Sequence, residues 1–482
     1  MRLKNYQCRF LCLAGAGLSL FLLFTGGCTV GPDYTRTEPN LPGQWSVADL
    51  AEAANPTELG RWWTTFDDAL LTMLIERADT GNLDLKVSLA RIDQSRALRR
   101  YAGGENAPTV DATGSYTRAR VSENGPYAPQ DGSSPEATSL YSAGFDAGWE
   151  LDLFGRIRRS VESAQAALEQ SIEDYRNVRV SLYAEVARNY IELRTAQVRT
   201  QYALSNIDIQ RKTLELTQNR FDAEIAPELD VSQARLNLAN TESEIPLLRI
   251  AESAAINRLS VLVGATPQVL REELTSPSGL PQVRTMPTAG LPAELLRQRP
   301  DIRSAERALA AQTARIGIAQ SQLYPSFSLR GVLVLEATQF SNMGDLSSYA
   351  YSFGPGLRWN LFDGNRVRSL VTVEEAKTRQ LAAAYEASVL RAIEEVENSM
   401  VGYVQQNERV AALQRSVDAA QKSVAMVETL YRSGLTDFQN VLDSQRSLFT
   451  QQDRLAVSEG LILQQVVGLY KALGGGWDID SN

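Results

Sequence analysis

The residue types on which enzymes most often rely are scarce in this chain. Its 482 residues include no histidine and only three cysteines, which leaves no source for the usual nucleophile and base pairs or for zinc ligands. The sequence also lacks a G-x-x-x-x-G-K-[ST] phosphate loop and a G-x-S-x-G nucleophile elbow. Carboxylates are frequent, but on highly charged helices we interpret them as solvated or ion-paired groups. We therefore expect neither an enzyme nor a protein with a metal or organic cofactor.

Cys28 is the residue for which the sequence predicts a covalent modification. It follows a basic start and an apolar run, Leu11–Phe24, which together are typical of a secretory signal. The small residues that end this run directly before a cysteine are similar to a bacterial lipoprotein signal, with Thr25 where leucine is usual. This similarity implies that residues 1–27 are removed and that Cys28 carries a covalent lipid. Ordinary cleavage, or an unmodified cysteine, is the alternative.

The overall charge and hydropathy exclude one class of partner and one kind of membrane element. The net charge is −9, and no cluster of Lys and Arg alternates with aromatic residues, so we exclude nucleic acid as a partner. Beyond residue 27 the sequence contains no apolar run as long as a membrane-spanning helix needs. A lipid on Cys28 could attach the chain to a membrane, and only a β-barrel could carry it across one.

Two stretches have the alternation of a β-strand with one apolar and one polar face. From Tyr141 to Leu151 every odd position is apolar and every even position is small or polar, and Tyr349–Leu361 repeats this pattern apart from Pro355. Aromatic residues lie near both ends of each stretch, as in strands that cross an outer membrane. We assign to the membrane interfaces Tyr141, Trp149, Tyr349, Tyr351 and Trp359. One face of a soluble β-sandwich would show the same alternation.

A plan of helix, hairpin, long helix and returning helix occurs twice. Apolar residues follow steps of three and four through about 155–222 and again through about 365–431. Helices of that length, roughly 100 Å, fit a coiled coil better than a compact domain. At a sequence offset of 210, Trp149 matches Trp359 and Gly264 matches Gly474. The sequence therefore predicts an internal two-fold repeat.

The predicted organisation assigns every part of the chain to a segment. The segments are a lipoprotein signal peptide (1–27), an extended N-terminal arm (28–61), a first repeat (62–264), a Pro-rich equatorial belt (265–300), a second repeat (301–474) and a C-terminal tail (475–482). The first repeat contains a β-hairpin at about 109–151, and the second contains one at about 327–361.

Two hairpins per chain predict an oligomer. Four lipid-facing strands would leave edge N–H and C=O groups unpaired in hydrocarbon. Three chains would supply about twelve strands, enough to close a barrel around a water-filled lumen. The expected fold is thus an α+β membrane protein, a trimeric 12-stranded outer-membrane β-barrel continuous with a long periplasmic α-helical coiled-coil barrel.

Several segments of the chain have the sequences of family motifs. They are CTVGPDY from Cys28, WWTTFDDALLTMLI at Trp62–Ile75, LLRQRPDIRSAERALAAQTARIGIAQSQLYPSFSL at Leu295–Leu329, WNLFDGNRVR at Trp359–Arg368, LYRSGLTDFQNVLDSQRSLF at Leu430–Phe449 and LYKALGGGW at Leu469–Trp477. In this order they resemble the TolC family of outer-membrane efflux channels, and most closely its OprM-like, NodT-type lipoprotein branch. The resemblance covers essentially the whole mature chain.

The resemblance implies a function and a set of partners. Such proteins are homotrimers in the outer membrane of Gram-negative bacteria, with a periplasmic extension that docks a periplasmic adaptor, or membrane fusion protein, and an inner-membrane RND-type pump. It implies a passive, gated exit duct for small molecules such as drugs or other toxic compounds. A duct for secreted polypeptides is an alternative within the same fold, and a non-conducting coiled-coil tether is a third possibility.

The resemblance also implies a gate at the periplasmic tip. Tyr431 matches the gate tyrosine of the family, Asp230 its hydrogen-bond acceptor, and Asp443 an aspartate that forms a ring in the pore. Asn440 stands where the family has a second ring aspartate, and Thr436 where it has an arginine, so we expect a weaker electrostatic lock. Glu224 likewise stands at a turn position where glycine is frequent. As the alternative, Tyr431 and Asp443 are ordinary capping and surface residues.

Overall fold

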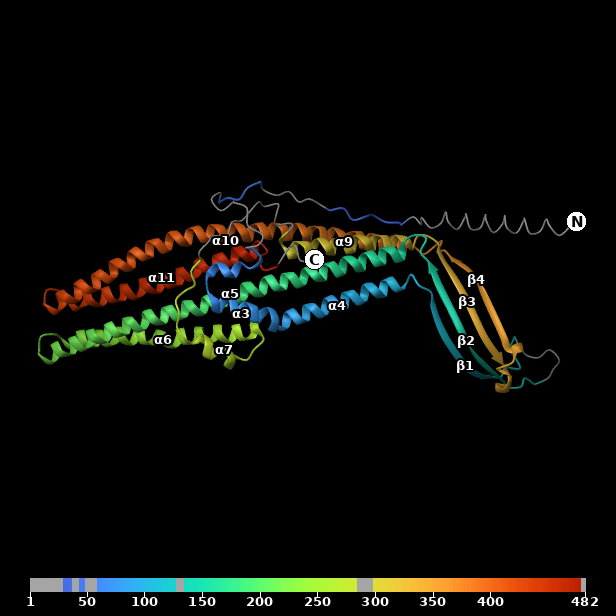
Figure 1. The fold of residues 1–482 in the computed structure, drawn as a ribbon, viewed down its shortest axis with the longest axis horizontal. Coiled ribbons are helices and arrows are strands. Elements are labelled where there is room, and N and C mark those ends of the chain that lie inside the picture. Colours follow the sequence, from blue (N-terminus) through green and yellow to red (C-terminus); the bar gives the residue numbers. More distant parts are fainter. Residues whose placement is uncertain (1–28, 37–42, 48–58, 127–133, 284–297, 478–482) are drawn as a thin grey trace. The chain divides into compact units, whose positions relative to one another are not determined.

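A computed structural model of the chain describes residues 29–36, 43–47, 59–126, 134–283 and 298–477 (Figure 1). The predicted signal peptide and Cys28 lie outside these residues. The chain divides into two compact units. The first comprises Met1–Thr37, Asp93–Gln170 and Glu306–Ala384, and the second comprises Glu38–Ile92, Ser171–Ala305 and Tyr385–Asn482. Each unit takes residues from both predicted repeats.

The first unit contains a four-stranded antiparallel sheet. Its strands are β1 (Thr109–Ala119), β2 (Thr138–Leu151), β3 (Ser326–Ala337) and β4 (Tyr349–Arg358), paired in the order β1-β2-β3-β4. They lie side by side in Figure 1. Two short 3₁₀ turns, Phe340–Asn342 and Leu346–Ser348, connect β3 to β4. Only β2 and β3 have a partner strand on both sides, so β1 and β4 are edges.

The last strand is shorter than the sequence predicts. We expected it to continue to Leu361, but β4 ends at Arg358. The chain then turns at Gly364 and Asn365, whose φ angles are 65° and 67°. Left-handed backbone of this kind cannot continue a strand, so it redirects the chain into the helix that follows.

Four helices contain a point at which the chain passes from one unit to the other. They are α4 (Leu83–Gly104), α5 (Arg156–Asp222), α9 (Pro300–Ser321) and α10 (Arg366–Arg432). Both α5 and α10 are 67 residues long, which at 1.5 Å per residue is about 100 Å. Among the residues described, no helix has the length and hydrophobicity needed to cross a membrane.

The second unit holds the remaining helices. They are the 3₁₀ helix η2 (Trp62–Phe66), α3 (Ala69–Gly81), α6 (Glu228–Val263), α7 (Pro267–Leu274) and α11 (Phe438–Ala472). We expected an irregular belt at 265–300, whereas α7 is helical because Pro267 stands at its first turn, where a missing N–H costs no hydrogen bond. Residues 284–297 of the belt lie outside the described part. Gly264, with φ 73°, ends α6 as a left-handed cap.

The main hydrophobic core of the second unit is built from aromatic residues. Trp62 is fully buried and stacks on Tyr470 of α11, with ring centroids 5.3 Å apart. Tyr190 of α5 donates its hydroxyl hydrogen to Asp68 at 2.7 Å, and the same carboxylate caps the start of α3 through the N–H groups of Leu70 and Leu71. Truncating a buried tryptophan typically costs about 3–5 kcal/mol, and the core also includes residues from the middle of both long helices, such as Tyr190 of α5 and Val396 of α10.

Candidate functional site

The strands of the first unit form a wall with an exposed apolar face. In β2, the residues from Tyr141 to Trp149 alternate between the two faces, and the register pairs Phe145 with Ala112 of β1 and Leu333 of β3. Phe145 is 55% exposed and Phe353 of β4 is 73% exposed. Large aromatic side chains on a sheet face are normally covered, so this face is one that another apolar phase or chain would cover.

The opposite face of the sheet carries an acidic cross-strand pair. Asp111 of β1 and Asp146 of β2 are direct partners in the register of these strands. Like charges placed directly opposite one another destabilise a strand pair. Such a pair is tolerated where water reaches it, which fits a face that lines an aqueous space.

The aromatic residues predicted for the interfaces lie at two ends of the sheet. Trp149 donates its indole N–H to the carbonyl of Asn106 at 2.9 Å, and Trp359 donates to the carbonyl of Leu323 at 3.1 Å. Each acceptor follows the helix that leads into a hairpin, so the two tryptophans make equivalent contacts. Tyr141, Tyr349 and Tyr351 lie at the other end: Tyr141 contacts Tyr116 and Phe340, and Tyr349 contacts Tyr351. Their position at a membrane surface stays a prediction.

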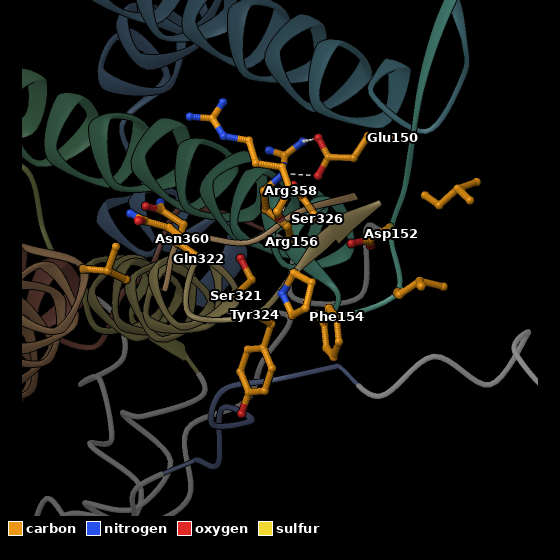
Figure 2. Close-up of a pocket in the computed structure, with 14 residues that line it drawn as sticks. Glu150, Asp152, Phe154, Arg156, Ser321, Gln322, Tyr324, Ser326, Arg358 and Asn360 are labelled. Atoms are coloured by element: carbon orange, nitrogen blue, oxygen red, sulfur yellow. Dashed lines mark hydrogen bonds and ion pairs between the residues drawn. The ribbon is translucent and has the colours of Figure 1, made fainter. Parts of the chain in front are cut away.

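A polar pocket lies where the strands pass into the helices (Figure 2). Arg156, the first residue of α5, donates to Glu150 at 2.8 Å and to Glu105 at 2.9 Å. Hydrogen bonding to Glu150 raises the pKa of Arg156 above its ordinary value, so its charge is constant. Phe154 and Tyr324 stack beside the pocket with centroids 4.8 Å apart. The ion pairs fix the direction in which α5 leaves β2.

In the second unit, two helical hairpins end in short turns. The turn at 223–227 joins α5 to α6, and the turn at 433–437 joins α10 to α11 (Figure 1). Gly434 has φ 71° and Glu224, at the corresponding point of the other turn, has φ 59°. Left-handed backbone is easily adopted by glycine and is strained for glutamate. The sequence departure at Glu224 therefore falls on a position whose geometry favours glycine.

Tyr431 lies at the centre of a small apolar cluster between the hairpins. Its ring is 5.3 Å from that of Phe438, and Val441, Leu442 and Ala234 complete the cluster. The sequence predicts a hydrogen bond from Tyr431 to Asp230, but the buried hydroxyl has no hydrogen-bond partner among the described residues of this chain. The ring turns into the apolar cluster, which accounts for the difference. Burial raises the pKa of this hydroxyl above its ordinary value.

Arg220, in the last turn of α5, makes the polar contact between the hairpins that the sequence did not indicate. It donates to the backbone carbonyl of Tyr431 at 2.9 Å, and its guanidinium lies 4.8 Å from the centre of the Tyr431 ring. It also lies 3.4 Å from the carbonyl of Arg432. These carbonyls are at the C-terminus of α10, where a cation is favourable, and the carbonyl of Tyr431 also accepts from the N–H of Gly434 at 3.0 Å. An arginine in a last turn normally suggests a cap of its own helix, so the sequence contained no specific signal.

Acidic residues surround this contact. Burial raises the pKa of Asp230, the negative charge of Asp437 raises it further, and the positive charge of Arg220 opposes the rise. Asp443 is exposed and accepts a hydrogen bond from Gln439 at 3.0 Å. Asn440 donates to the hydroxyl of Thr436 at 2.8 Å. Two of the residues that depart from the family pattern therefore bond to each other, Thr436 in the turn before α11 and Asn440 in the first turn of α11.

Buried polar side chains connect the hairpins further along. Gln445 of α11 is 2% exposed and donates to Thr213 of α5 at 2.7 Å, and Asn206 donates to Gln452 at 2.6 Å. Arg199 pairs with Asp453 at 2.7 Å. A contact built from amide and hydroxyl bonds gains less from exclusion of water than an apolar one. These polar contacts can hold the two hairpins in register while stabilising them less than the aromatic core stabilises the helices that it joins.

The chain matches known proteins over almost its entire length. Residues 74–265 and 291–475 match the family described as outer membrane efflux protein. Nodulation protein T of Rhizobium leguminosarum bv. trifolii is 32% identical over 465 residues, which are 95% of this chain and 96% of that protein. The solvent efflux pump outer membrane protein SrpC of Pseudomonas putida is 30% identical over 469 residues, 96% of this chain and 98% of that protein.

A comparison with solved structures gives the same result. The outer-membrane channel OprN is 36% identical, with a TM-score of 0.86 over 94% of this chain and 100% of that one. CusC is 26% identical, with a TM-score of 0.80 over 93% of this chain and 100% of that one. Of these relatives, SrpC is named as an efflux pump protein and OprN as an outer-membrane channel. The chain belongs to the TolC family of outer-membrane efflux proteins and is an efflux channel of its OprM- and NodT-like branch.

Proposed function

We propose that three copies of this chain form one closed duct. The carrying observation is the four-stranded sheet whose edges, β1 and β4, have no partner strand among the described residues and whose apolar face is exposed. An edge in hydrocarbon leaves backbone groups unsatisfied, and pairing β4 of one copy with β1 of the next removes every edge. Twelve strands then enclose a lumen lined by the polar face, and the long helices continue the wall as a coiled-coil barrel.

The matching lengths of corresponding helices support this arrangement. Helices α5 and α10 have equal lengths, and α6 and α11 have 36 and 35 residues. Two helical hairpins of nearly equal length per chain would give the trimer six such hairpins. These could pack side by side around a helical tube with similar contacts at every interface. Within this duct, Cys28 carries the lipid, and the aromatic residues at the two ends of the sheet lie at the membrane interfaces.

The duct exports small organic molecules and works with a periplasmic adaptor and an inner-membrane RND-type pump. Among the relatives, SrpC is named for solvent efflux, while CusC of Escherichia coli is named for cation efflux. The absence of histidine and the low number of methionines, six in the chain, favour the organic class, because imidazole and thioether groups are the usual soft-metal ligands.

At the periplasmic tip, the contact of Arg220 with the end of α10 keeps the hairpins together in the closed state. Three copies of Asp443 line the narrow end, where converging carboxylates favour cations. Asn440 and Thr436 contribute neither the negative nor the positive charge that the family has at those positions. Adaptor docking opens the tip by separating the two hairpins of each chain.

Affinity purification from chemically cross-linked cells tests the proposed partners. A tagged chain should recover a periplasmic adaptor and an RND-type transporter, and a deletion strain should become hypersensitive to organic solvents and hydrophobic drugs. Recovery of an ATP-driven secretion transporter together with a secreted polypeptide, and unchanged solvent tolerance, would instead identify a polypeptide duct.

A further inference from the structure

Residues 29–36 are fastened to the strand-bearing unit over their whole length. The N–H of Val30 donates to the carbonyl of Phe154, which lies between the end of β2 and the start of α5, at 3.2 Å. Tyr34 lies under the guanidinium of Arg307 and beside Ala166 and Ala310. The predicted extended arm is therefore, in this part, a docked segment, although it forms neither helix nor strand.

Arg159 makes most of the polar contacts to this segment. Its side chain is 3% exposed. It donates to the carbonyls of Val30 at 3.1 Å and Gly31 at 3.0 Å, and to the carboxylate of Asp33 at 2.8 Å. A fourth bond pairs Arg159 with Glu162 at 2.7 Å. A guanidinium offers five donors in a fixed plane, and here three of its bonds hold one short segment, at two backbone carbonyls and one side-chain carboxylate.

Glycines allow the segment to approach closely. At Gly155, which has φ 82°, a β-carbon would lie 2.7 Å from the Cγ2 of Thr29. At Gly317 of α9, a β-carbon would lie 2.8 Å from the carbonyl oxygen of Val30. Both distances are far below ordinary van der Waals contact, so a glycine directly before α5 and a glycine within α9 leave room where the segment passes.

The corresponding position of the other long helix lacks this arginine. Arg159 is the fourth residue of α5, and the fourth residue of α10 is Ser369, which is exposed. The backbone bonds agree, since Arg159 N–H donates to Gly155 and Ser369 N–H donates to Asn365. The two helices thus begin with the same backbone bond, although one has Arg159 and the other Ser369 at this position. The start of α5 therefore does not need an arginine here, which indicates that Arg159 binds the N-terminal segment.

We propose that Arg159 is a positioning residue that fastens the lipid-bearing start of the mature chain to the point where β2 passes into α5. Thr29 touches Gly155 at this point, and Cys28 is one peptide unit away, about 3.8 Å between α-carbons. The aromatic pair Phe154 and Tyr324 lies at the same junction (Figure 2). A lipid on Cys28 therefore enters the membrane beside the end of the strands. The inference rests on the proposed lipidation of Cys28.

A spin label at residue 35 tests the fastening in the full chain. Thr35 is exposed, and after loss of the signal and acylation of Cys28 a Thr35→Cys variant has one free thiol. The spectrum should show slow motion in the parent and a shift to fast motion in Arg159→Ala. Asp33→Ala removes one exposed carboxylate that pairs with Arg159 and leaves the two bonds to backbone carbonyls in place. It should therefore give a smaller shift in the same direction. Arg315→Ala, an exposed arginine of α9, is the matched control and should leave the spectrum unchanged.

Incorporation of labelled palmitate, measured on the same preparations, separates the two claims. Equal incorporation in all variants with fast motion only in Arg159→Ala and Asp33→Ala supports the proposal. The same mobility in Arg159→Ala and in the parent overturns it. Absence of palmitate from the parent, with the mobility difference still present, overturns the lipidation and leaves the role of Arg159 in fastening the segment intact.

Discussion

At the scale of single residues, the proposed gate depends on the contact between Arg220 and the end of α10. One guanidinium reaches the backbone carbonyl of Tyr431 and lies over its ring. Its Nε is buried without a hydrogen-bond partner among the described residues, so the group is held by these contacts with α10 and not by its own helix. Separating the hairpins must therefore break a charge-assisted hydrogen bond and expose the apolar cluster around Tyr431.

Replacing Arg220 by alanine should open the tip. Loss of a hydrogen bond from a charged group typically removes about 1.5–3 kcal/mol, which is roughly a tenfold or greater change in the closed-to-open ratio. We expect a higher mean conductance of the purified Arg220→Ala protein in planar bilayers. Arg211→Ala is the control, because Arg211 pairs with Glu242 on the same hairpin and is 62% exposed. Equal conductance of parent and Arg220→Ala would place the gate elsewhere.

The raised pKa of Asp230 makes the gate sensitive to pH. A carboxyl whose pKa is raised in the closed arrangement binds its proton more tightly there than when the hairpins separate, so protonation favours closure. The stabilisation is complete below the ordinary pKa of aspartate and disappears as pH rises through the raised value. Conductance should fall on acidification over this range.

Asp230→Asn tests this linkage. The variant has no titrating group at this position, so its conductance should lose that part of the pH dependence. Asp208→Asn is the control and should retain it, because the exposed Asp208 pairs with Lys212 of its own helix. A pH profile of Asp230→Asn that superimposes on the parent profile would show that another group controls the response.

At the scale of elements, the two turns that end the helical hairpins have the same backbone conformation but differ in residue type at the strained position. Glu224 and Gly434 have similar positive φ angles, yet only one is glycine. A non-glycine residue in this region costs of order 1 kcal/mol. The first turn is therefore the less stable of the two.

Exchange of these residue types should change local opening in opposite directions. Glu224→Gly should slow tryptic cleavage at Arg220, and Gly434→Glu should accelerate cleavage at Arg432, each by about fivefold for 1 kcal/mol. Glu224→Ala, which removes the same charge but keeps a β-carbon at this positive φ, is the control and should be cleaved at the rate of the parent. A rate for Glu224→Ala as slow as that for Glu224→Gly would mean that charge and not backbone strain controls the turn.

The sequence predicted the regular elements well because their signals are local. The alternation from Tyr141 to Leu151 identifies β2, and the absence of glycine and proline after Arg156 identifies α5 as one helix. The end of β4 at Arg358 and the helix α7 in the Pro-rich belt were missed. Both depend on where a turn or a cap falls, which a short apolar pattern does not determine.

The candidate site was less predictable because its contacts join residues far apart in the sequence. The resemblance pointed to Tyr431 and Asp230, but the orientation of the Tyr431 ring depends on Phe438, Val441 and the facing hairpin. Arg220 contacts a backbone carbonyl, and any side chain at position 431 would present one. No residue pattern in the chain can encode such a contact, so only the folded hairpins reveal it.

At the scale of the whole molecule, function depends on assembly. One chain supplies four strands with two free edges and an exposed apolar face, and these features are liabilities for a chain that works alone. They become a closed wall when copies join edge to edge. Two copies would give about eight strands and an interior filled by side chains, so a lumen wide enough for solutes needs more than two, and we propose three.

Native mass spectrometry of the protein released from the outer membrane in mild detergent is the direct test of the proposed trimeric barrel. We expect a single major species containing three mature chains, each carrying the mass of its lipid. A stable species of one, two or four chains, with no population of three, would contradict the proposed barrel.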